Sequence, residues 1–414
     1  MDIVDVLRYF ADFNIPTSLK PRELKVEEMP GKAVVITGPR RAGKTYYLYW
    51  LMSRRGGIYV DFEHPLFEGF KPRDVEVLVE AHARLGGPKA AYLDEVQAVE
   101  GWEKAVRYLL DRGYSVYATG STSALLAGDV AREMRGRGLT YLLLPLSFRE
   151  YLLFKGIDPR PDLVWRPERH AVAKLQEEYL KFGGFPEVAL GGDPYRLLKE
   201  YLLTVVVRDV ADRHGVRNRA ALDAVVAYVL NNYGRYLTYS SLHRLLKQRG
   251  VTKRTVINYV KYLEDAFFLF QVKRFAKSTR EAEAAPRKIY LVDTGYGLLG
   301  RKDPSRDLEN AVFLELLRRA LSSSPPAEIY YAAGERWEVD FLVTVGGQPA
   351  EAVQVAAELH EENMEREVEA LARAARRLGA RKATVVTLHQ EAKLGKVEVK
   401  PFWRWALEGW NPYS

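Results

Sequence analysis

Cysteine is absent from this sequence of 414 residues, and long apolar runs are absent as well. Without cysteine the chain cannot form disulfides, a thiolate zinc site or a cysteine nucleophile. The longest apolar stretches, 139–146 and 266–270, are far shorter than the roughly 20 residues of a membrane-spanning helix. The amino terminus carries Asp2 and Asp5, where a secretory signal would have basic residues. We therefore expect a cytoplasmic protein without a membrane partner.

The composition also lacks the bias of a disordered or collagen-like chain, because 47% of the residues are hydrophobic and 28% are charged. The formal net charge is +8, and it is unevenly distributed. Residues 235–280 contain eleven Lys or Arg residues and two acidic residues, so this segment alone accounts for the whole excess. A solvated basic surface and a nucleic-acid contact are both consistent with such a segment.

Short apolar runs alternate with helical patterns in the first third of the chain, which is typical of a parallel sheet covered on both faces. The expected strands are 33–37, 58–61, 89–94, 114–119 and 139–144, and the expected helices between them are 45–54, 72–85 and 101–112. The expected domains are an N-terminal helix and connector (1–30), an α/β core (31–150), a helical segment (151–232), a winged-helix segment (233–284) and a mixed α/β segment (285–414).

A glycine-rich loop follows the first expected strand and opens the next helix. Its sequence fits G-x-x-x-x-G-K-[ST], and its residues are Gly38, Pro39, Arg40, Arg41, Ala42, Gly43, Lys44 and Thr45. The glycines let backbone N–H groups surround a phosphate at the positive end of the helix. Lys44 is expected to neutralise the β- and γ-phosphate oxygens, and the Thr45 hydroxyl to ligate Mg²⁺. This pattern predicts ATP and Mg²⁺ as cofactors.

A pair of acidic residues, Asp94 and Glu95, ends the expected strand 89–94. Many strands end in such a pair at a surface loop. Downstream of a phosphate loop, however, the pair is typical of NTPases in which a catalytic glutamate follows the metal-binding aspartate. We expect Asp94 to hold Mg²⁺ through water and Glu95 to polarise the attacking water.

Two further candidates follow in the sequence. Ser121 lies two residues after the end of the strand 114–119, where a polar side chain can contact the γ-phosphate or the water. Capping a helix is the alternative role. Arg132, Arg135 and Arg137 are candidates for an arginine that reaches a neighbouring subunit's nucleotide, and we favour Arg137. Surface arginines without a role are the alternative.

The sequence resembles the prokaryotic AAA+ ATPases, abundant in archaea, that join an ATPase core and a winged helix to a C-terminal nuclease-like domain. The resemblance covers nearly the whole chain, through the segments 38–45, 93–97, 119–123, 144–148, 183–186, 339–343 and 401–403. It implies ATP binding and hydrolysis, with Lys44, Thr45, Asp94 and Glu95 in the roles given above.

The basic segment has the pattern of a helix-turn-helix with a wing. Its second helix, 252–263, would enter a major groove with Lys253, Arg254 and Asn258 near the bases. Lys273 and Arg274 are expected at the tip of the wing. Duplex DNA is the predicted partner; a lid on the ATPase or a protein contact is the alternative.

The last segment resembles PD-(D/E)XK nucleases in its α-β-β-α-β order. Those enzymes need Asp on one strand and Glu-x-Lys on the next to bind metal and activate water. Asp340 is present, but the second position appears as Gln354 and the lysine position as Ala356; Glu351 would serve only after a register shift. We therefore expect a nuclease-like domain without activity.

Taken together, the sequence predicts an α/β protein. It has the parallel sheet of an AAA+ P-loop NTPase, a helical lid, a winged helix and a nuclease-like C-terminal domain. We expect an ATPase that hydrolyses Mg-ATP to drive or gate a DNA-binding module. A nucleotide-gated DNA or protein adaptor without significant turnover and an ATP-regulated nuclease are the alternatives. A protein partner and assembly into a homo-oligomer stay open.

Overall fold

The computed structural model describes residues 2–125, 134, 136–160, 162–163, 166–276, 278–335 and 337–408. By their internal contacts these residues form two compact units. The first comprises Met1–Leu144 with Asp265–Phe267, and the second comprises Pro145–Glu264 with Phe268–Ser414. No helix among the described residues is both long enough and apolar enough to cross a membrane.

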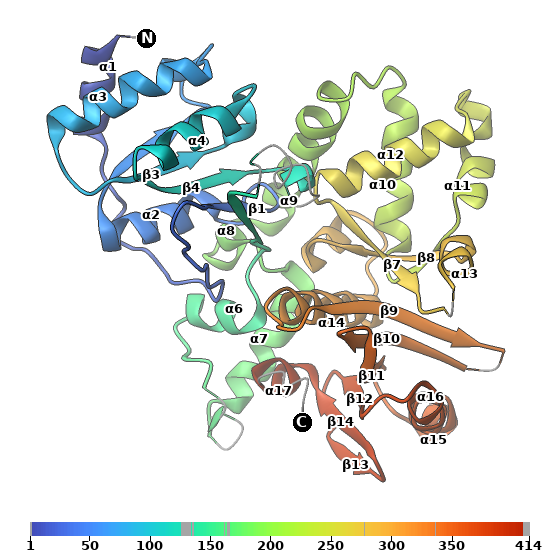
Figure 1. Ribbon diagram of the computed structural model, residues 1–414. Coiled ribbons are helices and arrows are strands. Elements are labelled where there is room, and N and C mark those ends of the chain that lie inside the picture. Colours follow the sequence, from blue (N-terminus) through green and yellow to red (C-terminus); the bar gives the residue numbers. More distant parts are fainter. Residues whose placement is uncertain are drawn as a thin grey trace. The chain divides into compact units, whose positions relative to one another are not determined.

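The first unit is built on a parallel sheet of five strands in the order β2-β3-β4-β1-β5 (Figure 1). The strands are β1 (Ala33–Thr37), β2 (Ile58–Asp61), β3 (Ala90–Asp94), β4 (Ser115–Gly120) and β5 (Gly138–Leu142). The helices are α1 (Ile3–Asp12), α2 (Lys44–Arg55), α3 (Val75–Leu85) and α4 (Trp102–Asp111), with short turns η1 (Pro65–Phe67), η2 (Pro72–Asp74), η3 (Val96–Ala98) and η4 (Ser123–Leu125). The expected parallel sheet is confirmed.

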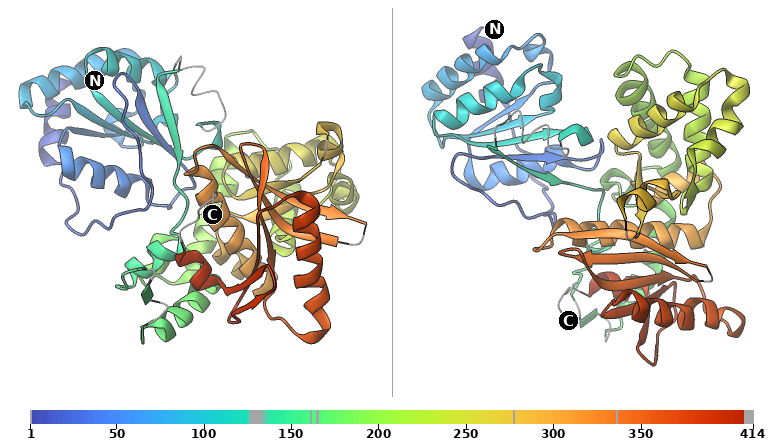
Figure 2. Two further views of the ribbon diagram at one scale, coloured as in Figure 1. Left: turned by 60° about the horizontal axis from the view of Figure 1, so that its bottom comes forward. Right: turned by 45° about the vertical axis from the view of Figure 1, so that its right-hand side comes forward.

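Helices cover both faces of this sheet, which is why its strands are apolar throughout. Alternate strand residues, such as Val35 and Leu93, pack with α1, α3 and α4 in one core. Their neighbours, such as Ile36 and Tyr92, pack with Tyr47 and other residues of α2 in a second core. Figure 2 shows the helices on the two sides of the strands.

The second unit begins with helices and continues into a mixed sheet. Its N-terminal half contains α6 (Phe148–Phe154), α7 (Arg169–Phe182), α8 (Pro186–Ala189), α9 (Pro194–Thr204), the π-helix η6 (Val205–Asp212), α10 (Arg219–Asn232), β6 (Arg235–Leu237), α11 (Tyr239–Leu246), η7 (Lys247–Arg249) and α12 (Lys253–Asp265). Its C-terminal half contains β7 (Leu269–Arg274), α13 (Thr279–Ala284), β8 (Arg287–Leu291), η8 (Thr294–Leu299), α14 (Pro304–Leu321), β9 (Ala327–Gly334), β10 (Trp337–Val345), β11 (Gln348–Val355), α15 (Glu361–Met364), the π-helix η9 (Glu365–Glu369), α16 (Ala370–Leu378), β12 (Lys382–Thr387), β13 (Ala392–Leu394), β14 (Val397–Pro401) and α17 (Phe402–Leu407).

The nine strands of this unit form one sheet, in the order β13-β14-β12-β11-β10-β9-β7-β8-β6. Side chains of α6, α7, α14 and α17 pack in a core on one face, whereas α16 packs in a separate core with strand residues such as Leu342 and Val385. The sheet crosses the domain boundary that the sequence suggests at residue 284, because β7 pairs with β8 on one side and with β9 on the other. The segments 233–284 and 285–414 therefore share a sheet.

Two local expectations differ from the structure. Strand β9 was not expected, although Ile329, Tyr330 and Tyr331 favour a strand; it forms because β10 and β7 lie on its two sides. The order before α15 is thus helix followed by three strands rather than two. Lys273 and Arg274 were expected at a wing tip and instead lie on β7, inside the sheet.

Candidate nucleotide-binding site

The glycine-rich loop connects β1 to α2 at the carboxyl-terminal edge of the first sheet. Gly38 has a positive φ of 154°, and a Cβ there would lie 2.1 Å from the carbonyl oxygen of Leu143. Only glycine permits this close approach of two backbone segments. Gly43, with φ of 95°, directly precedes the first residue of α2, Lys44. The loop therefore curls against the N-terminus of a helix, as phosphate binding requires.

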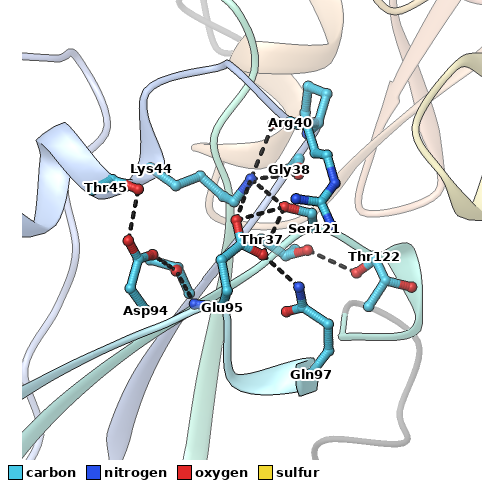
Figure 3. Close-up of polar contacts among 12 residues, drawn as sticks. Thr37, Gly38, Arg40, Lys44, Thr45, Asp94, Glu95, Gln97, Ser121 and Thr122 are labelled. Carbon is cyan, nitrogen blue, oxygen red and sulfur yellow. Dashed lines mark hydrogen bonds and ion pairs between the residues drawn. The ribbon is translucent and has the colours of Figure 1, made fainter. Parts of the chain in front are cut away.

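The Lys44 ammonium lies buried inside this loop (Figure 3). It donates to the carbonyl oxygens of Gly38 and Pro39 at 3.1 and 3.0 Å, and to the Ser121 hydroxyl at 2.8 Å. Its Nζ is 3.9 Å from a carboxylate oxygen of Glu95. Lys44 and Ser121, which were each expected at the nucleotide site, are therefore in direct contact.

The Asp94 carboxylate, at the end of β3, accepts hydrogen bonds from three side-chain hydroxyls. Thr45 donates at 2.7 Å and Tyr59 at 2.8 Å to the same oxygen, while Thr119 donates to the other. Burial raises the pKa of Asp94, and hydrogen bonds from Thr119, Thr45 and Tyr59 oppose that rise without cancelling it. Thr45 and Asp94 together offer hard oxygen donors, which suit Mg²⁺.

Glu95 has a left-handed backbone conformation, with φ of 52°, which is uncommon for a residue with a side chain. Its N–H donates to the Thr119 hydroxyl at 3.1 Å, and its carboxylate accepts from Ser121 at 2.9 and 3.0 Å and from the Gln97 amide. Burial raises the pKa of Glu95, but the Lys44 ammonium and the Gln97 hydrogen bond outweigh burial and hold it below its ordinary value. Glu95 is therefore a carboxylate near neutral pH.

Several residues that support the site were not predicted. Arg22 donates to the carbonyl oxygens of Ala42 and Leu144, both at 2.7 Å, and so fixes the loop from the N-terminal connector. Glu63, which pairs with the loop residue Arg40 at 3.2 Å, was not predicted either. Tyr59, Gln97 and Thr119 were missed as well. The contacts of Tyr59 and Thr119 with Asp94 depend on which strands lie side by side, and no local pattern in the sequence reports that.

Arg137 does not lie in this site. It directly precedes β5, at the amino-terminal edge of the sheet, whereas the glycine-rich loop lies at the opposite edge. Its guanidinium contacts the Asp111 carboxylate at 2.5 Å. A role in a neighbouring subunit stays a prediction, and the two other candidates, Arg132 and Arg135, lie outside the described residues.

The five residues that were expected to contact DNA divide into two groups in the structure. Lys253 and Arg254 are exposed in the first turn of α12, and Asn258 lies partly exposed one turn later. Lys273 instead pairs with Glu283 at 2.9 Å, and Arg274 donates to the carbonyl oxygen of Ala333 at 2.8 Å. The residues of α12 are therefore at least partly exposed to solvent, whereas Lys273 and Arg274 make contacts within the second unit.

The donor chemistry of the site fits a magnesium ion that is held partly by a bound nucleotide. Among the described residues, no group of three or more His, Cys, Asp or Glu side chains is arranged to hold a metal ion by itself. At the glycine-rich loop the protein offers one hydroxyl, from Thr45, and one carboxylate, from Asp94. Mg²⁺ commonly binds through one or two protein ligands, substrate phosphates and water.

Two family patterns match this chain. The AAA domain family (AAA_14) matches residues 30–152, and a domain of unknown function (DUF8612) matches residues 173–302. The fold is also similar to that of the Walker-type ATPase paby2304 of Pyrococcus abyssi, at 15% identity over 64% of this chain and 90% of that one, with a TM-score of 0.38. The RuvB Holliday junction branch migration motor of Thermotoga maritima is 18% identical over 58% and 82%, with a TM-score of 0.28.

Two curated proteins match most of the chain. The uncharacterized protein MJ1544 of Methanocaldococcus jannaschii is 32% identical over 406 residues, covering 93% of this chain and 90% of its own length. An uncharacterized protein of Haemophilus influenzae is 31% identical over 353 residues, covering 80% of this chain and 84% of its own. This chain therefore belongs to one family with these two proteins, and it carries an AAA domain at residues 30–152.

Proposed function

We propose that this protein binds Mg-ATP and hydrolyses it to ADP and phosphate. The observation that carries the proposal is the convergence of Lys44, Thr45, Asp94, Glu95 and Ser121 within one hydrogen-bonded network at the end of the sheet. These side chains come from α2, the end of β3 and the residues after β4. A lysine, a metal-binding pair and a carboxylate base are the groups that phosphoryl transfer to water needs.

Each residue has a specific task in this mechanism. Lys44 exchanges its contacts with the Gly38 and Pro39 carbonyls for the phosphate oxygens of ATP. Thr45 and Asp94 would hold Mg²⁺, and the ion would supply positive charge beside the phosphates. Glu95, ionised near neutral pH, accepts a proton from the attacking water. Ser121 orients Glu95 and can contact the γ-phosphate.

Glu95→Gln and Lys44→Ala test this proposal. Glu95→Gln should bind ATP almost normally and lower turnover at least about tenfold, and up to a hundredfold, as expected for loss of a general base. Lys44→Ala should weaken ATP binding itself. Glu80→Gln makes the same chemical change on an exposed face of α3 and should leave turnover unchanged. Normal turnover by Glu95→Gln would show that another group activates the water.

A second proposed function is duplex DNA binding through α12. It is favoured by the exposed side chains of Lys253 and Arg254 at the start of the helix and by the excess of basic residues in this segment. In this proposal the ATP cycle gates the DNA-binding surface. Binding to a protein partner, without significant ATP turnover, is the alternative that the same measurements test.

A further inference from the structure

A second cluster of buried charges lies in the C-terminal half of the second unit. The Lys288 ammonium, on β8, is 2.8 Å from Asp340, 2.9 Å from Glu338 and 3.3 Å from Glu309. Asp340 and Glu338 come from β10, and Glu309 comes from α14. Lys288 donates hydrogen bonds to Asp340 and Glu309 and forms an ion pair with Glu338, so its ammonium is surrounded by carboxylates.

The groups around this ammonium are engaged as well. The second Asp340 oxygen accepts from the Val355 N–H at 3.0 Å, and the Glu309 oxygen also accepts from the Tyr290 hydroxyl at 2.7 Å. The Gln354 amide accepts from the Asp340 N–H at 3.2 Å and donates to Glu367 at 2.9 Å. Gln354 thus braces the backbone of β10 and does not offer its oxygen to the centre of the cluster.

The cation at the centre of this cluster comes from the chain itself. Lys288 and Asp340 are buried, whereas the Glu338 side chain is 43% exposed, so solvent screens its charge. Asp340, the most buried of the three carboxylates, is therefore paired with the buried ammonium of Lys288, and the Glu309 carboxylate is held by both Lys288 and Tyr290.

This cluster contains Asp340, the residue at which the resemblance to PD-(D/E)XK nucleases predicts a metal centre. The position at which those nucleases carry a lysine is occupied here by Ala356, which has no charge. Lys288, on β8, contacts Asp340 instead. A divalent ion would draw its oxygen ligands to about 2.0–2.6 Å and would need the space that the ammonium fills. We propose that Lys288 is a built-in cation that replaces a divalent metal ion at this centre, so that this unit is stabilised without metal and does not cleave nucleic acid.

The proposal predicts that removing the lysine creates a metal site. We expect Lys288→Ala to lower the thermal unfolding midpoint in EDTA, because three carboxylates are left without their cation. Mn²⁺ should then raise the midpoint of this variant by about 3 °C or more. The response should disappear in the double variant Lys288→Ala/Asp340→Asn. All measurements use the full chain without nucleotide, and circular dichroism confirms folding.

Two controls separate this from ordinary loss of an ion pair. Lys302→Ala removes a lysine that pairs at 2.9 Å with Asp307, a residue of α14, the helix that also carries Glu309. This variant should show no Asp340-dependent response to Mn²⁺. In the parent, Mn²⁺ binding measured by electron paramagnetic resonance should equal that of Asp340→Asn. This comparison tests the proposal even if Lys288→Ala fails to fold.

Three results would overturn the proposal. The first is Mn²⁺ binding by the parent that Asp340→Asn removes. The second is Mg²⁺- or Mn²⁺-dependent DNA cleavage by the parent that Asp340→Asn abolishes. The third is a folded Lys288→Ala variant whose stability does not respond to Mn²⁺. None of these results depends on ATP binding or turnover.

Discussion

Among single residues, Asp94 is held by more hydroxyl groups than its sequence pattern predicts. Thr45 is part of the glycine-rich loop, but Tyr59 comes from β2 and Thr119 from β4. These contacts stabilise the ionised form of a buried carboxylate, which burial alone would disfavour. The metal binding proposed for Asp94 would therefore depend on residues outside the motif.

Tyr59→Phe tests this dependence through pH. Loss of the hydroxyl removes a hydrogen bond that lowers the pKa of Asp94, so this pKa should rise further. A protonated Asp94 cannot bind Mg²⁺, so activity is lost as the pH falls through its pKa. The acid limb of the kcat/KM profile for ATP hydrolysis should therefore move to higher pH, because kcat/KM reports the free enzyme.

Tyr49→Phe is the matched control for this experiment. The Tyr49 hydroxyl contacts Tyr59 at 3.4 Å and makes no described hydrogen bond to Asp94. It should leave the acid limb in place. A limb that moves equally in both variants would indicate a general effect of aromatic packing rather than an effect on Asp94.

The residues that we propose to react can be selected from the sequence, whereas most of the residues that support them cannot. Lys44, Thr45, Asp94 and Glu95 follow from a motif whose spacing is local, and Ser121 follows from the end of a neighbouring strand. Arg22 gives no such signal, because its partners, Ala42 and Leu144, are brought to it only by the fold. Supporting residues are selected by tertiary contacts, which a single sequence does not contain.

At the scale of elements, the turn after α7 depends on one glycine. Gly183 has a φ of 83°, and a Cβ there would lie 1.7 Å from a carboxylate oxygen of Asp293. Asp293 in turn accepts from the N–H groups of Gly184 and Gly295 at 2.7 and 2.9 Å. This carboxylate therefore joins the turn to η8.

We expect Gly183→Ala to destabilise the second unit strongly. Gly183 combines its positive φ with a ψ of −171°, a backbone region that is essentially restricted to glycine and costs other residues about 1–3 kcal/mol. Displacement of Asp293 adds about 1–3 kcal/mol for buried groups that lose their partners. Gly191→Ala is the control, because Gly191 has a φ of 105° but no heavy atom within 4 Å of its added Cβ. Urea unfolding should show the larger loss for Gly183→Ala; equal losses would contradict the proposed clash.

The start of α12 carries the second prediction at this scale. If Lys253 and Arg254 contact phosphates, binding to duplex DNA should weaken steeply with salt, with a log–log slope of about −0.9 per contact. Replacing both residues with Ala should make this slope shallower by about one to two, while ATP turnover stays within a few fold. Lys393→Ala/Lys396→Ala, on the exposed β13–β14 hairpin, should leave the slope unchanged. A parent without duplex affinity at low salt would contradict the proposal.

Elements of the first unit are predicted more accurately than those of the second. Its strands are short, apolar and separated by helices, so each can be recognised alone. In the second unit, the sequence of β7 is that of an isolated wing strand, but β7 pairs with both β8 and β9, and β9 follows the serine- and proline-rich loop at residues 321–326. Strand partners that are distant in the sequence decide these assignments.

In the molecule as a whole, the proposed ATP site and the proposed DNA surface belong to different compact units. The ATP site is formed by residues of the first unit, and the N-terminal part of α12 belongs to the second. Gating therefore requires that ATP binding change the free energy of DNA binding across the two units. Such coupling is reciprocal: each ligand must change the affinity of the other by the same factor.

This reciprocity gives the last prediction. Glu95→Gln should hold Mg-ATP without turnover, so its affinity for duplex DNA can be measured with and without ATP at one salt concentration. We expect the two affinities to differ by about 5–150-fold, the usual range for allosteric coupling, and duplex DNA should change ATP affinity by the same factor. Lys44→Ala, which binds ATP weakly, should show no effect of ATP on DNA affinity. Equal DNA affinities in the presence and absence of ATP would contradict gating, because a ligand that binds two states equally cannot shift the equilibrium between them.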